Sequence, residues 1–273
     1  CFGLKRAQFF FSPVNEQQNL IEKAIKFGGM YQQAQQSSQA SLFGNSYVED
    51  VPEPPIPDCE EFPLLERLTH ERDTIGIYLT GHPLDEYRIT IGNFCNCQFT
   101  NIENNKNKEL AIGCMVTEAD HRTTKNGRSF GRFLLEDFSG SFELTLFGDD
   151  YINFKNYFEK GRFLFIRGRF QPNWNRTSEE LKVQQVKLLS TVLEDLSKKI
   201  TLTVPLARVN KKFIDQLEEL CLRHPGNMSL TVRVNDSQTN YSADLFSNKY
   251  RLAADLRVFD TIGQWDFVSY RLN

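Results

Sequence analysis

Residues 129–147 read SFGRFLLEDFSGSFELTLF, and this stretch decides the fold. In its second half Phe142, Leu144 and Leu146 alternate with polar residues. An apolar residue at every second position is typical of a β-strand with one buried face. The Ser139-Gly140 pair between the two halves is a turn signal. The two halves therefore predict consecutive strands of an antiparallel sheet.

The chain on either side of this stretch continues the pattern. Three further strands are predicted at residues 110–122, 162–170 and 181–189. The Asn126-Gly127 pair suits a tight turn before the second strand. A helix is predicted at residues 149–158, after the third strand. The order β-β-β-α-β-β is that of the OB-fold, a five-stranded, partly open β-barrel whose face and loops commonly hold oligonucleotides.

The rest of the chain divides into parts of different composition. A helix is predicted around residues 16–27, and the Gln-, Ser- and Pro-rich text after it has little apolar surface to bury. Residues 200–271 alternate strand and helix patterns, ending in a strand at 265–271. We expect a multidomain α+β chain with five parts: an N-terminal helical segment (1–30), a flexible linker (31–62), a helical connector (63–107), the OB-fold β-barrel (108–192) and a C-terminal α/β domain (193–273).

Composition excludes several classes of protein. The 273 residues are 40% hydrophobic, 25% charged and 12% aromatic, which is typical of a soluble globular protein. No apolar run approaches the roughly 20 residues of a membrane-spanning helix, and no secretory signal is evident, so we expect a cytoplasmic protein. A net charge of -3 argues against a wholly basic nucleic-acid-binding protein, although a local basic face is compatible with an acidic total.

Reactive groups do not converge on a catalytic pattern. The six cysteines lack a CxxC pair, the four histidines lack metal-ligand spacing, and no phosphate-binding glycine loop is present. Asp137, Asp149 and Asp150 could form a two-metal carboxylate set, but they fit better as turn and helix-start residues. We therefore predict no catalytic residue, no metal site and no cofactor in this chain.

Basic and aromatic residues gather at two loops of the predicted barrel. Such residues would follow a phosphate backbone and stack on bases, each stack contributing roughly 1–3 kcal/mol. The alternative is a merely solvated rim, because Glu136, Asp137, Glu179 and Glu180 lie nearby in the sequence. The predicted nucleic-acid-binding residues are Arg122, Lys125, Arg128, Phe130, Arg132, Arg167, Arg169, Trp174 and Arg176.

The linker contains an apolar pair within the peptide Gln39-Ala40-Ser41-Leu42-Phe43. Large apolar side chains in a polar linker have no core of their own to enter, so they favour docking into a partner's pocket. We expect a linear docking peptide whose contacts are Gln39, Ser41, Leu42 and Phe43.

Several motifs resemble one family, the bacterial replicative DNA polymerase III alpha subunit. Residues 78–87 (YLTGHPLDEY) and 134–140 (LLEDFSG) are similar to segments of that family, and residues 1–8 (CFGLKRAQ) resemble the end of its helix-hairpin-helix region. Residues 39–43 resemble the peptide by which the family binds its sliding clamp. Residues 200–226 resemble its C-terminal domain, which in some members contacts the clamp-loader tau subunit.

The resemblance implies the C-terminal portion of a polymerase, which binds the sliding clamp and positions single-stranded template DNA. The family's catalytic aspartates lie in a palm domain that precedes the matched motifs. The chain itself is therefore expected to be inactive, although its parent would be a DNA-directed DNA polymerase. The alternative is a stand-alone OB-fold nucleic-acid-binding protein, and a phosphoryl-transfer enzyme is a third possibility.

Overall fold

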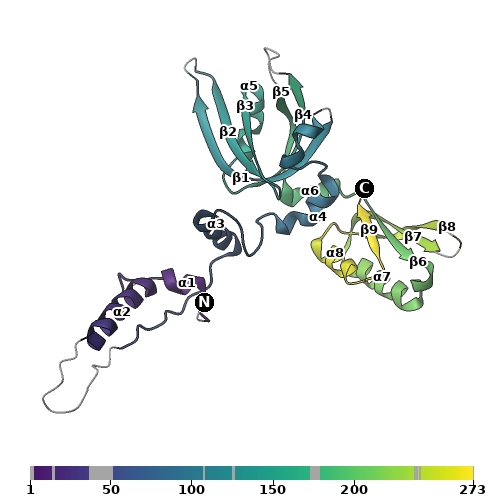
Figure 1. The fold of residues 1–273 in the computed structure, drawn as a ribbon. Helices are drawn as coiled ribbons and strands as arrows, with labels where there is room; N and C mark the ends of the chain where they lie inside the picture. Colours follow the sequence, from purple (N-terminus) through teal and green to yellow (C-terminus); the bar gives the residue numbers. More distant parts are fainter. Residues whose placement is uncertain are drawn as a thin grey trace. The chain divides into compact units, whose positions relative to one another are not determined.

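The computed structural model describes residues 3–13, 16–36, 52–106, 108–124, 127–172, 179–236, 239 and 241–272. These residues form two compact units that divide between Gly81 and His82. The first unit is helical, and the second contains two sheets (Figure 1). None of the helices in the described part of the chain is long and apolar enough to cross a membrane.

The first unit contains α1 (Arg6–Phe10), α2 (Leu20–Gln36) and α3 (Leu64–Ile75). The predicted connector helix is confirmed by α3. In contrast, α2 continues through Gly28-Gly29, where the sequence pattern predicted an end. Helix formers explain the extension, because residues 31–36 read YQQAQQ, and the Tyr31 ring stacks on Phe27 one turn earlier, with centroids 6.0 Å apart.

Glu71 joins three segments of the first unit. Its carboxylate accepts hydrogen bonds from the backbone N–H groups of Leu79 (2.9 Å) and Thr80 (3.0 Å) and from the Thr80 hydroxyl (2.9 Å). It also pairs with Arg6 Nη1 of α1 at 2.6 Å. The Thr80 backbone hydrogen bond, followed by the Arg6 contact, lowers the pKa of Glu71 to about 2. An ionised Glu71 therefore holds α1 and the chain after α3 against α3.

Five strands form the sheet of the OB-fold domain: β1 (Glu109–Thr123), β2 (Ser129–Glu136), β3 (Ser141–Phe147), β4 (Phe163–Pro172) and β5 (Glu179–Leu188). Between β3 and β4 lie α5 (Gly148–Phe154) and the 3₁₀ turn η4 (Lys155–Tyr157), which confirms the predicted order of elements. The strands are antiparallel in the order β3-β2-β1-β4-β5 (Figure 1). No strand pair closes the barrel within the described residues, so the predicted barrel is an open sheet between β3 and β5.

The central strand β1 carries the core of this domain. Its inward-facing residues Leu110, Ile112, Cys114 and Val116 are at most 1% exposed. The first half of β1 pairs with β4 and the second half with β2, and a bulge follows Val116 where the partner changes. A bulge adds bend and twist to a strand, so one continuous strand can serve both halves of the rolled sheet.

Asp137 organises the turn between β2 and β3, as the sequence predicted. Its Oδ1 accepts the backbone N–H groups of Ser139 (2.7 Å) and Gly140 (3.0 Å) and the Ser139 hydroxyl (2.7 Å). Its Oδ2 accepts the Phe99 N–H at 2.7 Å. The buried carboxylate therefore fixes the turn and ties it to the 3₁₀ turn η2 (Phe99–Asn101). A second 3₁₀ turn, η3 (Glu103–Asn105), follows η2 and precedes β1.

The outer side of the first half of β1 and of β4 is covered. The 3₁₀ turn η1 (Asp85–Tyr87), α4 (Arg88–Phe94) and α6 (Leu189–Leu196) surround a small core there. Gly113 permits the close approach of α4, because a Cβ at this position would lie 2.6 Å from Ile91 Cγ1. The residues of this core are Leu84, Ala111, Phe165, Leu189 and Val192.

The C-terminal domain is an α/β fold, as predicted, with a four-stranded sheet. Its elements are β6 (Lys199–Pro205), η5 (Leu206–Arg208), α7 (Lys211–Arg223), β7 (Pro225–Asp236), β8 (Tyr241–Leu252), α8 (Leu256–Gly263) and β9 (Ser269–Leu272). The sheet order is β8-β7-β6-β9, with β6 and β7 parallel and the other pairs antiparallel. The last strand begins at Ser269, later than predicted, because Trp265 and Val268 close a turn (2.8 Å) and Trp265 packs edge-on against Phe213.

Glu71 is expected to make the first unit sensitive to acid. Its pKa is about 2 in the folded chain and 4.5 otherwise, so its contribution is fully present above pH 4.5 and is lost as the pH falls toward 2. Amide hydrogen exchange at Leu79 and Thr80, normalised to intrinsic rates, should accelerate across this window. In the Glu71→Gln variant these two amides should exchange fast even at neutral pH. In the Glu66→Gln variant, which changes an exposed residue of the same helix, they should stay protected. Equal protection in Glu71→Gln and wild type would contradict the assignment.

Candidate nucleic-acid interface

Two phenylalanine rings form a platform on the outer face of the OB-fold sheet. Phe130 of β2 and Phe147 of β3 are directly paired in register. Their ring centroids lie 5.4 Å apart with the planes inclined by 19°, so the rings stack. The pleat directs them outward, because their neighbours Gly131 and Leu146 face the core. Phe147 is 54% exposed and Phe130 is half-buried, so the pair offers one largely exposed ring on which a base can stack.

Arg122 and Arg132 flank the Phe130–Phe147 platform. Arg122 is paired with Phe130 across β1 and β2, and Arg132 follows two residues later on the same face of β2. Arg122 Nη2 lies 2.5 Å from Asp120 Oδ2, and Arg132 Nε lies 2.7 Å from Glu143 Oε1. The Arg122 hydrogen bond lowers the pKa of Asp120. These ion pairs orient the guanidinium groups but offset part of their charge, so a phosphate must compete with carboxylates.

Arg128 lies at the tip of the β1–β2 hairpin. Thr124 Oγ1 accepts its backbone N–H at 3.0 Å, and Gly127 adopts the positive φ of 75° that the tight turn requires. The side chain is exposed, and it makes no ion pair within the described residues. Arg128 is therefore the predicted cation of this face with the least carboxylate competition.

The arginines of β4 lie apart from the platform. Arg167 and Arg169 pair with the first half of β1, whereas Arg122 lies on its second half. The half-buried Arg167 holds its guanidinium carbon 5.5 Å from the centre of the Phe165 ring, within the face that α4 and α6 cover. The structure thus brings Arg122, Phe130 and Arg132 together and leaves Arg167 outside this group. The other predicted binding residues, Lys125, Trp174 and Arg176 together with Gln39, Ser41, Leu42 and Phe43, lie outside the described residues.

Phe147 was not among the residues predicted from the sequence. The signal was present, because Phe142, Leu144 and Leu146 define the inward phase of β3 and Phe147 falls in the opposite phase. What the sequence lacked was the register that places Phe147 directly beside Phe130.

The aspartates considered for metal chemistry have structural roles. Asp137 accepts the turn hydrogen bonds described above. Asp149 and Asp150 lie in the first turn of α5, and Asp150 Oδ2 pairs with Lys182 Nζ of β5 at 2.6 Å. No group of three or more His, Cys, Asp or Glu side chains that could hold a metal ion occurs in the described part of the chain.

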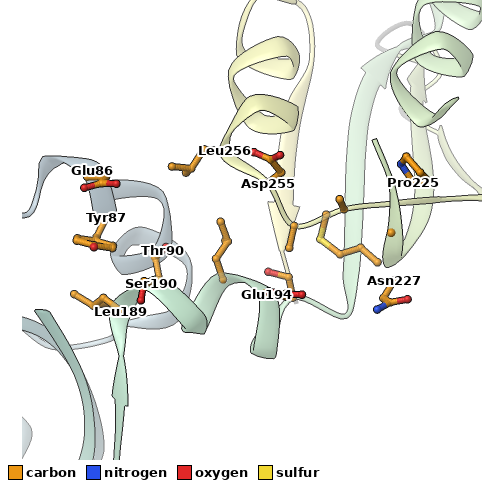
Figure 2. Close-up of a pocket in the computed structure, with 16 residues that line it drawn as sticks. Glu86, Tyr87, Thr90, Leu189, Ser190, Glu194, Pro225, Asn227, Asp255 and Leu256 are labelled. Atoms are coloured by element: carbon orange, nitrogen blue, oxygen red, sulfur yellow. The ribbon is translucent and has the colours of Figure 1, made fainter. Parts of the chain in front are cut away.

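A cavity of about 610 Å³ lies beside the OB-fold domain, among α4, α6, the start of β7 and the chain that leads into α8 (Figure 2). Glu86, Glu194 and Asp255 line it, and no basic side chain does. Their charge makes the cavity unsuitable for a phosphate, so it is not part of the candidate nucleic-acid interface.

Comparison with known proteins agrees with both domains. Residues 115–189 match the model of the OB-fold nucleic acid binding domain, and residues 200–273 match that of the DNA polymerase III alpha subunit, C-terminal domain. The DNA polymerase III subunit alpha of Vibrio cholerae is 25% identical over 219 residues, which are 79% of this chain and 18% of that protein. Its counterpart in Treponema pallidum is 36% identical over 130 residues, 46% of this chain and 11% of that protein. The resemblance seen in the sequence is confirmed, and the matched segments span only 18% and 11% of the lengths of these two relatives.

Among solved structures, this chain is similar to the second OB-fold domain of replication protein A from Methanococcus maripaludis. The alignment covers 30% of this chain and 84% of the replication protein A chain. The sequence identity is 20% and the TM-score is 0.22.

The outward position of Phe147 can be tested by stability. Phe147→Ala should lower the free energy of unfolding by less than about 1 kcal/mol, because the ring is largely exposed. Phe133→Ala should lower it by about 3–5 kcal/mol, because that ring is fully buried against Phe158. Chemical denaturation followed by circular dichroism measures both changes. Similar decreases in the free energy of unfolding for the two variants would show that the inward and outward side chains of β2 and β3 are wrongly assigned.

Proposed function

We propose that this chain is the C-terminal portion of a replicative DNA polymerase and that its OB-fold domain holds single-stranded DNA on the Phe130–Phe147 platform. The stacked ring pair, with Phe147 largely exposed, is the observation that carries the proposal, because it can receive a base without reading its sequence. Arg122, Arg128 and Arg132 would contact the phosphates on either side. The matches of residues 115–189 and 200–273 support the assignment to such a polymerase.

Binding by this face should be weak and salt-dependent. Glu118, Asp120 and Glu143 point outward from the same strands, and the last two already pair with Arg122 and Arg132. Each phosphate contact nevertheless releases counterions, so affinity should fall with salt with a log-log slope of about -0.7 per phosphate. Weak binding suits a domain that positions a template and must let it move.

Two finer assignments rest on the sequence. We propose that the sliding clamp is bound by Gln39, Ser41, Leu42 and Phe43, because Leu42 and Phe43 are large apolar residues in a polar linker. We also propose that residues 200–273 contact the clamp loader, on the strength of their match to the polymerase C-terminal domain. Nucleotidyl transfer would then belong to the parent polymerase, and this chain would contribute DNA positioning and tethering.

Loss of the platform should weaken DNA binding. Phe130→Ala with Phe147→Ala should weaken binding of a fluorescent oligo-dT by about 5-fold or more, as expected when a stack worth at least about 1 kcal/mol is removed. Fluorescence anisotropy at low salt measures this change. Ile152→Ala, which removes another exposed apolar side chain of the same domain, should leave the affinity unchanged. Unaltered binding by the double phenylalanine variant would favour a merely solvated rim.

The linker peptide should account for clamp binding. A segment that becomes ordered on binding has modest affinity, so we expect micromolar binding of the purified clamp, roughly -8 kcal/mol. Leu42→Ala with Phe43→Ala should abolish the signal in isothermal titration calorimetry. Leu64→Ala with Leu65→Ala, two exposed leucines of α3, should retain it. The assignment fails if the two double variants bind the clamp equally.

A further inference from the structure

The sheet of the C-terminal domain has one covered face and one open face. Both α7 and α8 pack on the covered face, where Leu220, Cys221, Val258 and Phe259 meet the buried strand residues such as Leu202. Because strand residues alternate, every second residue of β6, β7 and β9 points away from these helices. Their cross-strand partners in β8 lie on the same face, and the register of β8 shifts between Phe246 and Arg251. This outer face of the C-terminal sheet consists of Lys199, Thr201, Thr203, Ser229, Thr231, Arg233, Asp244, Phe246, Arg251, Ser269 and Arg271.

The register arranges these side chains in rows across the strands. One row runs Arg271, Thr201, Thr231, Phe246, in which each residue is directly paired with the next. With strands about 4.8 Å apart, this row is about 14 Å long. A second row places Lys199, Ser229 and Arg251 beside it, and a third runs Ser269, Thr203, Arg233, Asp244.

The outer face is basic although the chain as a whole is acidic. It carries Lys199, Arg233, Arg251 and Arg271 against a single carboxylate, Asp244. Asp244 accepts two hydrogen bonds from Arg233, at 2.7 and 2.8 Å, which fixes that guanidinium on the surface. The whole chain has a net charge of -3. A local excess of positive charge on an acidic chain indicates an anionic partner for this face.

Phe246 indicates which kind of anionic partner binds the outer face. Its ring is 68% exposed at the end of the first row, and Lys199 Nζ lies 5.7 Å from its centre. An exposed ring beside cations and hydroxyl groups can stack on an unpaired base while its neighbours hold phosphates. An acidic peptide would use the charges but would leave this ring without a role. A double helix keeps its bases stacked on one another.

We propose that the outer face of the C-terminal sheet is a second binding site for single-stranded nucleic acid. The phosphate backbone contacts Arg271, Lys199 and Arg251, a base stacks on Phe246, and the half-buried Thr201 lies in the row between Arg271 and Phe246. This site lies on a different sheet from the Phe130–Phe147 platform, so it goes beyond the proposed function and does not depend on it.

The test uses the full chain and a fluorescent oligo-dT of about 30 nucleotides, longer than the roughly 4–16 nucleotides that one OB-fold covers. Arg251→Ala with Arg271→Ala should weaken binding and reduce the log-log salt slope by about 1.4, or 0.7 for each phosphate that is no longer neutralised. Arg223→Ala with Arg257→Ala makes the same change of charge at the helices, on side chains 71% and 78% exposed, and should leave the slope unchanged.

Phe246 provides the second readout. Phe246→Ala should weaken binding about 5-fold or more, and Phe246→Tyr, which keeps the ring, should restore it. Ultraviolet crosslinking of the bound oligo-dT, mapped by mass spectrometry, should label the β8 peptide that contains Phe246. Unchanged salt slope and affinity in the outer-face variants, or crosslinks confined to the OB-fold domain, would overturn the proposal.

Two further outcomes separate this site from its alternatives. If Phe130→Ala with Phe147→Ala binds normally while the outer-face variants do not, this site stands and the OB-fold proposal fails; the reverse result overturns this site alone. Poly-glutamate tests the alternative of an acidic polypeptide. The nucleic-acid proposal is wrong if the chain binds poly-glutamate as tightly as oligo-dT, if Arg251→Ala with Arg271→Ala weakens that binding, and if Phe246→Ala leaves it unchanged.

Discussion

The two-residue alternation of the β-strand is the constraint on which both sheets of this protein depend. A strand that buries every second side chain must present the others on its opposite face. In β1 the inward phase is apolar and at most 1% exposed from Leu110 to Val116. The same rule that builds the core therefore directs Phe130, Phe147 and Arg132 to the outside of the OB-fold sheet. In the C-terminal domain it directs Arg271 and Phe246 away from α7 and α8.

Two buried carboxylates, Glu71 and Asp137, anchor the backbone of this chain. Glu71 accepts two N–H groups of the segment after α3, and Asp137 accepts three N–H groups around the β2–β3 turn. Both side chains are 4% exposed. Buried backbone donors without partners are costly, so a buried acid that satisfies several at once stabilises a turn strongly. Asp137, one of the acids considered for metal chemistry, is therefore part of the turn structure.

Prediction of the candidate site from sequence succeeded for some residues and failed for others, for a physical reason. Arg122, Phe130 and Arg132 come from one hairpin, so their proximity follows from local pairing. Phe147 was missed, and Arg167 was predicted to flank the same ligand face as the hairpin, because both depend on which strands become neighbours in the sheet. The open edge between β3 and β5 likewise depends on how the sheet rolls, which no local pattern encodes.

By itself, the sequence determined the strands and helices of the OB-fold domain, their order, and the turn role of Asp137, since these depend on periodicity and on residues close together in the chain. It also determined the mixed α/β character of the C-terminal part. The cross-strand rows of the C-terminal sheet and the packing of α4 and α6 on the face that carries Arg167 followed only from the tertiary structure. These features arise from contacts between residues distant in sequence or from packing that outweighs local propensity, and a single sequence does not record which distant residues will meet.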